Sequence, residues 1–124
     1  MLRFFALTGR LFMLALLAGV SLAGHDALEA RASSTSINII EPTDNEDDYA
    51  FEKTNVTVMA GETVTWLNKG TESHTVTADG GAFDSKDVDP GASWSYTFAT
   101  PGTYTYYCDP HPWMQGTVIV QPAL

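Results

Sequence analysis

The side chains with the clearest chemical capacity lie in one short stretch near the C-terminus. Cys108, His111 and Met114 follow one another at spacings of three residues, inside a loop that also contains prolines. A tight loop with these spacings can return all three side chains to one centre. A thiolate, an imidazole and a thioether form a soft set of donors, and such a set suits a copper ion.

A mononuclear copper site that transfers electrons needs one cysteine, two histidines and a weak axial methionine. The chain has two further histidines. One of them, His25, lies in an N-terminal segment that we expect either to be removed with the leader or to form a flexible extension of the domain. His74 lies 34 residues before Cys108, at the start of a predicted strand, where a sandwich can bring it to the same end. The sequence therefore predicts one copper ion with four ligands: His74, Cys108, His111 and Met114.

Each of these ligands also has an ordinary structural interpretation. A single cysteine at a strand end is commonly a small buried apolar residue, and a histidine or a methionine can simply pack. Packing alone would require the one cysteine, two histidines and a correctly spaced methionine to coincide at one sheet end. The joint pattern therefore favours a metal site.

The elements that must position these ligands are strands. Apolar and polar residues alternate in 63–68, 94–98 and 104–107, which is the period of a half-buried strand. Glycine and proline separate the runs. About seven short strands with regular turns predict an all-β fold, an antiparallel sandwich or barrel, in which Tyr106 and Cys108 share one face.

Residues 1–32 have the pattern of a signal peptide. Two arginines precede an apolar run of 13 residues, and small residues then allow cleavage after Ala23 or Ala32. Thirteen helical residues extend about 20 Å, which is less than the roughly 30 Å of a bilayer core. We expect export, with residues 33–124 as a single periplasmic or otherwise extracytoplasmic domain. The alternative is an uncleaved anchor.

The composition excludes several classes of protein. The chain has 124 residues, one cysteine and a formal net charge of -9. One cysteine cannot form an intrachain disulfide framework, a four-cysteine zinc site or an all-cysteine iron–sulfur cluster. Without the two acids and three arginines of 1–32, the net charge of 33–124 is -10. So acidic a domain does not suit a nucleic-acid partner.

The negative charge is densest in the acidic segment 41–52, which contains six carboxylates. Such a segment can be a solvated loop. It can also be a docking patch for a basic redox partner such as a c-type cytochrome, because complementary charge accelerates encounter. A third interpretation is adaptation to high salt, which fits the acidic composition of 33–124 equally well.

The chain resembles the cupredoxins, or small blue copper proteins, in three places. These are Gly61–Asn68, His74, and Pro101–Val118 with its Cys-x-x-His-x-x-Met loop flanked by prolines. The resemblance covers roughly 49–121, and the ligand loop is the short one of amicyanin-type and plastocyanin-type members. One departure is Thr75, which stands where the family often has an asparagine that ties the two ligand loops together.

The resemblance implies a Greek-key β-sandwich of about seven or eight strands and a monomeric carrier of single electrons rather than an enzyme. It implies Cu(I)/Cu(II) held by His74, Cys108 and His111, with Met114 axial. The implied partners are redox proteins, such as a c-type cytochrome or a dehydrogenase. From the short apolar run of the leader, we expect no membrane span in the mature form. We also expect the His111 ring edge to reach the surface beside Trp113. The alternative function is periplasmic copper binding or copper delivery without electron transfer.

Overall fold

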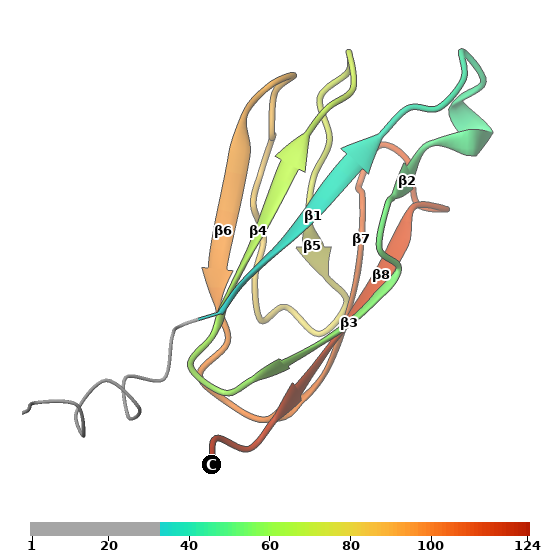
Figure 1. Ribbon diagram of the computed structural model, residues 1–124. Helices are drawn as coiled ribbons and strands as arrows, with labels where there is room; N and C mark the ends of the chain where they lie inside the picture. The colour runs from blue at the N-terminus through green and yellow to red at the C-terminus, as the bar shows by residue number, and fades with distance from the viewer. Residues whose placement is uncertain (1–32) are drawn as a thin grey trace, which may run out of the picture. The chain divides into compact units, whose positions relative to one another are not determined.

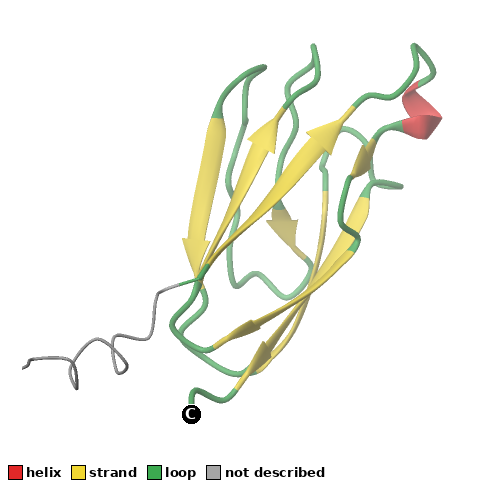
Figure 2. Cartoon of the chain, viewed as in Figure 1, coloured by secondary structure: helices red, strands yellow, loops and turns green. Residues whose placement is uncertain are grey.

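A computed structural model describes residues 33–124, which form a β-sandwich of two four-stranded sheets (Figures 1 and 2). Its elements are β1 (Ser34–Ile40), the 3-10 turn η1 (Glu46–Asp48), β2 (Ala50–Phe51), β3 (Asn55–Met59), β4 (Thr63–Asn68), β5 (Thr77–Ala78), β6 (Ser93–Thr97), β7 (Gly102–Tyr107) and β8 (Gln115–Gln121). The predicted sandwich is confirmed, with eight strands. The predicted signal peptide and both cleavage positions lie outside the described residues.

The first sheet has the strand order β2-β1-β4-β6, and the second has the order β3-β8-β7-β5. The β1–β4 and β3–β8 pairs are parallel, whereas all the other neighbours are antiparallel. The expectation of a purely antiparallel arrangement is therefore wrong at two pairs. Between β1 and β4 the chain crosses to the second sheet to form β3, so β4 returns in the direction of β1. Alternation of side chains along a strand carries no information on the direction of its neighbour.

The core lies between the two sheets, with Trp66 of β4 at its centre. This side chain is fully buried, and its ring meets the Tyr106 ring of β7 edge-on, with centroids 5.4 Å apart. Phe98 packs against the same indole. Complete burial of a large apolar side chain contributes roughly 1.5–3 kcal/mol. The aromatic cluster therefore fixes β4 and β7 relative to each other, and both strands run toward the same end.

That end of the sandwich collects the loops that matter for function (Figure 1). The strands β1, β4 and β7 end there, and β8 begins there. The loop that contains η1 and the loop between β7 and β8 therefore lie at the same end. Among residues 33–124, no helix is long and apolar enough to cross a bilayer.

Candidate metal centre

The loop between β7 and β8 is a pair of tight turns that places three predicted ligands. Cys108 directly follows β7 and Met114 directly precedes β8. The His111 N–H donates to the Cys108 carbonyl at 3.2 Å, and the Met114 N–H donates to the His111 carbonyl at 2.9 Å. The Cys108 N–H closes the loop on the Met114 carbonyl at 3.1 Å. As predicted from alternation, Cys108 and Tyr106 are both buried on the core side of β7.

His74 reaches the same place from the loop after β4. Its backbone forms an isolated bridge with Val88, with N–H to carbonyl distances of 3.2 and 2.7 Å in the two directions. The His74 Nδ1 atom lies 3.6 Å from the Cys108 Sγ atom, and the His111 Nδ1 atom lies 3.7 Å from it. The three donor atoms lie within 4.8 Å of one another. The prediction that His74 lies beside Cys108, although 34 residues separate them in the sequence, is therefore confirmed.

All four side chains are shielded from water. His74 and Cys108 are 0% exposed, Met114 is 1% exposed and His111 is 5% exposed. The cluster contains two ring nitrogens and one sulfur, with no carboxylate oxygen among them. A buried N₂S set of this kind fits copper rather than calcium or magnesium, which prefer oxygen ligands.

The Cys108 sulfur has one backbone donor from the neighbouring loop. The Thr75 N–H points at it at 3.3 Å. Burial raises the pKa of the Cys108 thiol, while this hydrogen bond and others nearby act in the opposite direction. A backbone hydrogen bond to a ligand sulfur is one of the protein's means of tuning a metal site.

Thr75 also joins the two ligand loops through its side chain. Its Oγ1 atom accepts a hydrogen bond from the Asp109 N–H at 2.8 Å and lies 2.9 Å from the Thr77 hydroxyl. The Thr77 hydroxyl in turn donates to the Asp109 carboxylate at 3.1 Å. A tie between the two ligand loops is therefore present, and the side chain of Thr75 makes it.

A buried asparagine, missed at the sequence level, organises the loop that carries His74. Asn68 is 0% exposed. Its Nδ2 group donates to the carbonyls of Glu72 and Val88 at 2.7 and 2.8 Å, and its Oδ1 atom accepts from the Gly70 N–H at 2.9 Å. The signal was its place at an inward position of the alternating run of β4, where a polar residue needs partners.

A carboxylate lies against the outer edge of the His74 ring. Glu41, directly after β1, places Oε1 2.9 Å from the His74 Nε2 atom. Although burial raises the pKa of Glu41, hydrogen bonds from the Thr71 and Glu72 backbone, from His74 and from the Thr71 hydroxyl lower it to about 2. The sequence placed Glu41 in the acidic segment but did not predict this contact.

The His111 side chain is largely covered, with only 6% of its surface exposed, so less of the ring reaches the surface than we expected. Tyr49 and Trp113 both meet the His111 ring edge-on, with centroids 5.3 Å apart in each pair. The Glu72 carboxylate lies 3.4 Å from the His111 Nε2 atom. Trp113 itself is 45% exposed, and its indole N–H donates to the Glu46 carbonyl of η1 at 2.9 Å. The acidic segment therefore covers the histidine and leaves the tryptophan at the surface.

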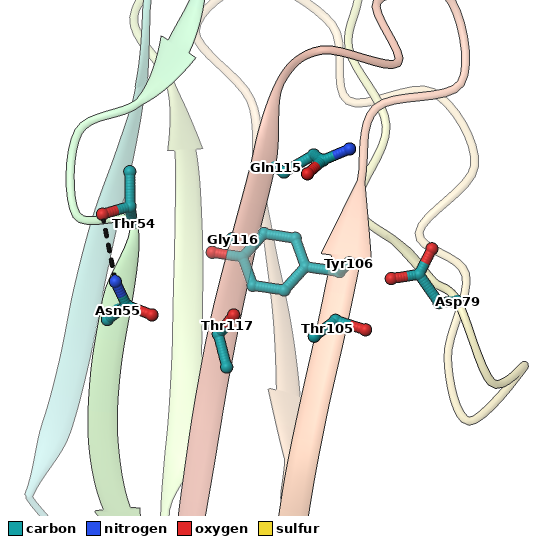
Figure 3. A pocket seen from close by; sticks show the side chains of 8 residues that line it. All are labelled: Thr54, Asn55, Asp79, Thr105, Tyr106, Gln115, Gly116 and Thr117. Carbon is teal, nitrogen blue, oxygen red and sulfur yellow. Dashed lines mark hydrogen bonds between the residues drawn. The ribbon is translucent and has the colours of Figure 1, made fainter.

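A separate shallow hollow of about 300 Å³ lies beside β7 and β8 (Figure 3). It is lined mostly by polar side chains: Thr54, Asn55, Asp79, Thr105, Tyr106, Gln115, Gly116 and Thr117. None of the four predicted ligands lines it. The hollow is therefore not part of the metal centre.

Comparisons with known proteins agree with this geometry. The model of the family described as copper binding proteins, plastocyanin/azurin family, matches residues 39–121. Amicyanin-alpha from Methylorubrum extorquens is 36% identical over 98 residues, which cover 75% of this chain and 76% of that protein. Plastocyanin from Scenedesmus fuscus is 40% identical over 84 residues, which cover 57% of this chain and 86% of that protein.

Solved structures of copper proteins also superpose on this chain. The Cu(I) form of an amicyanin variant superposes with a TM-score of 0.62 at 28% identity, covering 71% of this chain and 82% of that one. A purple cupredoxin from Nitrosopumilus maritimus also has a TM-score of 0.62, at 30% identity, covering 70% of this chain and 99% of that one. The sequence, the fold and the buried cluster together show that the chain belongs to the plastocyanin/azurin family of copper binding proteins.

Proposed function

We propose that the chain is a blue-copper electron carrier, in which His74, Cys108, His111 and Met114 would hold one copper ion. The convergence of two imidazole nitrogens and one sulfur within 4.8 Å, in a buried position, carries this proposal. When bound there, copper supplies one-electron chemistry by alternating between Cu(I) and Cu(II). This set of ligands is that of electron-transfer copper sites.

The protein's part is to hold the ligands still. Cys108 and Met114 are joined by a main-chain hydrogen bond, and the Thr75 hydroxyl fixes Asp109 beside them. Pro110 and Pro112 lack a backbone N–H and have a fixed φ, so the loop between the ligands has few alternative conformations. A site that changes little between oxidation states keeps the reorganisation that accompanies electron transfer small.

Copper delivery is the alternative function, and the burial of the thiol disfavours it. A delivery site exchanges its metal with a partner, so its ligands need access to that partner. Here Cys108 and His74 are 0% exposed. We also favour a carrier over an enzyme, because both histidines of residues 33–124 belong to the metal centre.

The surface above the centre suggests where electrons leave and what receives them. Trp113 is the exposed aromatic group in contact with the His111 ring, and η1, with Glu46, Asp47 and Asp48, lies directly beside it. We propose that this surface docks a basic redox protein, such as a c-type cytochrome or a dehydrogenase. Complementary charge would accelerate the encounter and salt would weaken it.

We further propose that the protein works outside the cytoplasm. The apolar run of 13 residues near the N-terminus, preceded by two arginines, supports export. A single thiol at the metal centre also suits an oxidising compartment, since it has no second thiol in its own chain with which to form a disulfide.

Addition of Cu(II) to the purified protein tests the proposed site. We expect one equivalent to bind and to produce an intense thiolate-to-copper charge-transfer band in the visible region. Cys108→Ser removes the thiolate and should abolish the band. A wild-type protein that stays colourless, or a band that survives in Cys108→Ser, would refute the proposal.

Stopped-flow mixing with a basic c-type cytochrome tests the docking surface. We expect the second-order rate constant to fall several-fold when the Debye length is shortened from about 30 Å to about 8 Å by added salt. Replacing both Asp47 and Asp48 with asparagine should reduce this salt dependence. The same double replacement at Asp79 and Asp84, two exposed residues in the loop between β5 and β6, removes the same two charges elsewhere and serves as the control. Equal salt dependence in all three proteins would exclude η1 from docking.

A further inference from the structure

The two nitrogen atoms of the His74 ring face two different groups. Nδ1 lies 3.6 Å from the Cys108 sulfur, and Nε2 lies 2.9 Å from the Glu41 carboxylate. The side chains of His74 and Glu41 are 0% and 7% exposed. Water therefore does not compete effectively for this contact, and the ring is held between the metal centre and one buried carboxylate.

The position of Glu41 is built into the surrounding loop. Its carboxylate accepts hydrogen bonds from the Thr71 N–H at 2.7 Å, from the Thr71 hydroxyl at 2.9 Å and from the Glu72 N–H at 2.9 Å. Gly70 leaves the space for it, because a Cβ atom at this position would overlap the carboxylate. Three hydrogen-bond donors, together with the space that Gly70 leaves, thus orient the Glu41 carboxylate toward the His74 Nε2 atom.

We propose that Glu41 is a positioning residue for the copper site, which selects the His74 tautomer and shifts the copper equilibrium toward Cu(II). The inference rests on the proposed function. As an acceptor, the Glu41 carboxylate requires the proton of the neutral imidazole to lie on Nε2, which leaves Nδ1 free as the ligand. As a negative charge, it stabilises the more positive oxidation state of a nearby metal.

Glu72 provides a graded comparison at the second histidine. Its carboxylate lies 3.4 Å from the His111 Nε2 atom, and its side chain is 43% exposed. Because water screens an exposed charge, Glu72 should affect the copper equilibrium less than Glu41 does. The structure thus predicts an order of effects as well as a direction.

Reduction potentials of copper-loaded variants test the proposal. At a fixed ambient potential, we expect Glu41→Gln to shift the Cu(II) to Cu(I) ratio at least tenfold toward Cu(I), which corresponds to about 59 mV for a one-electron couple. Gln keeps an acceptor oxygen and the side-chain volume, so the variant removes mainly the charge. Glu72→Gln should shift the ratio in the same direction by a smaller factor.

Glu62→Gln is the matched control. Glu62 also accepts a backbone hydrogen bond, from the Met59 N–H at 2.7 Å. It directly precedes β4, about 20 Å from the centre at about 3.3 Å per residue of strand. We expect no change in the ratio. A Glu41→Gln ratio equal to that of Glu62→Gln would overturn the proposal, and any loss of stability in that variant would then indicate a purely structural role.

A second measurement uses the wild-type protein in its diamagnetic Cu(I) form. NMR should show a His74 Nε2–H proton that exchanges slowly with water, because the buried carboxylate accepts it. Rapid exchange of this proton would contradict the inference even if no Glu41 variant folds. A wild-type protein that fails to bind copper would refute the proposed function as well, whereas wild-type binding with an unshifted Glu41→Gln ratio would refute only the role of Glu41.

Discussion

Replacement of Asn68 by alanine should destabilise the domain more than its small change in volume suggests. The asparagine side chain makes three hydrogen bonds to backbone groups, and it is completely buried. Val88, one of its partners, is also the backbone partner of His74. Asn68→Ala therefore removes the side-chain partner of the Glu72 carbonyl and of the Gly70 N–H, whereas the Val88 carbonyl keeps the His74 N–H as a donor.

The expected magnitude follows from these three bonds. Each contributes about 1 kcal/mol net, so Asn68→Ala should lower the free energy of unfolding by about 3 kcal/mol. For a domain of this size, that corresponds to a decrease in Tm of about 12–24 °C. The loop should open more often, and copper should dissociate faster.

Urea unfolding of the metal-free protein, followed by tryptophan fluorescence, measures this loss directly. Asn55→Ala is the matched control, because the Asn55 amide is exposed and its one hydrogen bond goes to the Thr54 hydroxyl at 3.3 Å. That variant should stay within about 0.5 kcal/mol of the wild type. A loss below about 1 kcal/mol for Asn68→Ala, or equal losses for the two variants, would refute the role assigned to Asn68.

Three further substitutions test the metal centre. Pro110→Ala introduces an N–H two residues after Cys108. If it donates to the Cys108 sulfur, it would withdraw electron density and raise the reduction potential, so an unchanged or lower potential in voltammetry would contradict this. Thr75→Val leaves the Asp109 N–H without its 2.8 Å acceptor, which should cost about 1–3 kcal/mol in urea unfolding; a neutral result would show that the tie is dispensable. Met114→Leu preserves volume and should change stability by less than about 1.5 kcal/mol. Removal of the thioether should nevertheless shift the reduction potential, and a potential equal to that of a Met59→Leu control would contradict this.

The local part of the site could be predicted from the sequence because the chain itself sets it. Cys108, His111 and Met114 lie within seven residues, so their meeting depends only on two tight turns. The pairing with His74 needed one further premise, that a sandwich brings the loop after β4 beside the loop after β7. The small number of histidines made that premise sufficient.

Contacts that depend on strand direction could not be predicted in this way. Glu41 reaches His74 because β1 is parallel to β4, with Ile39 opposite Asn68, so that the residues after both strands emerge together. Since alternation does not reveal a parallel neighbour, the acidic segment could be interpreted only as a solvated loop, as a docking patch or as an adaptation to high salt. Tyr49 reaches His111 from the position just before β2, which is an antiparallel neighbour of β1.

Spectroelectrochemistry of the copper-loaded protein tests the proposed function most directly. As the applied potential is stepped down and up, we predict that the thiolate-to-copper band bleaches and recovers completely, with one electron per protein molecule. The band should be absent at every potential in Cys108→Ser. A band that does not recover, a titration that requires more than one electron, or a coloured Cys108→Ser protein would contradict a blue-copper electron carrier built on this cysteine.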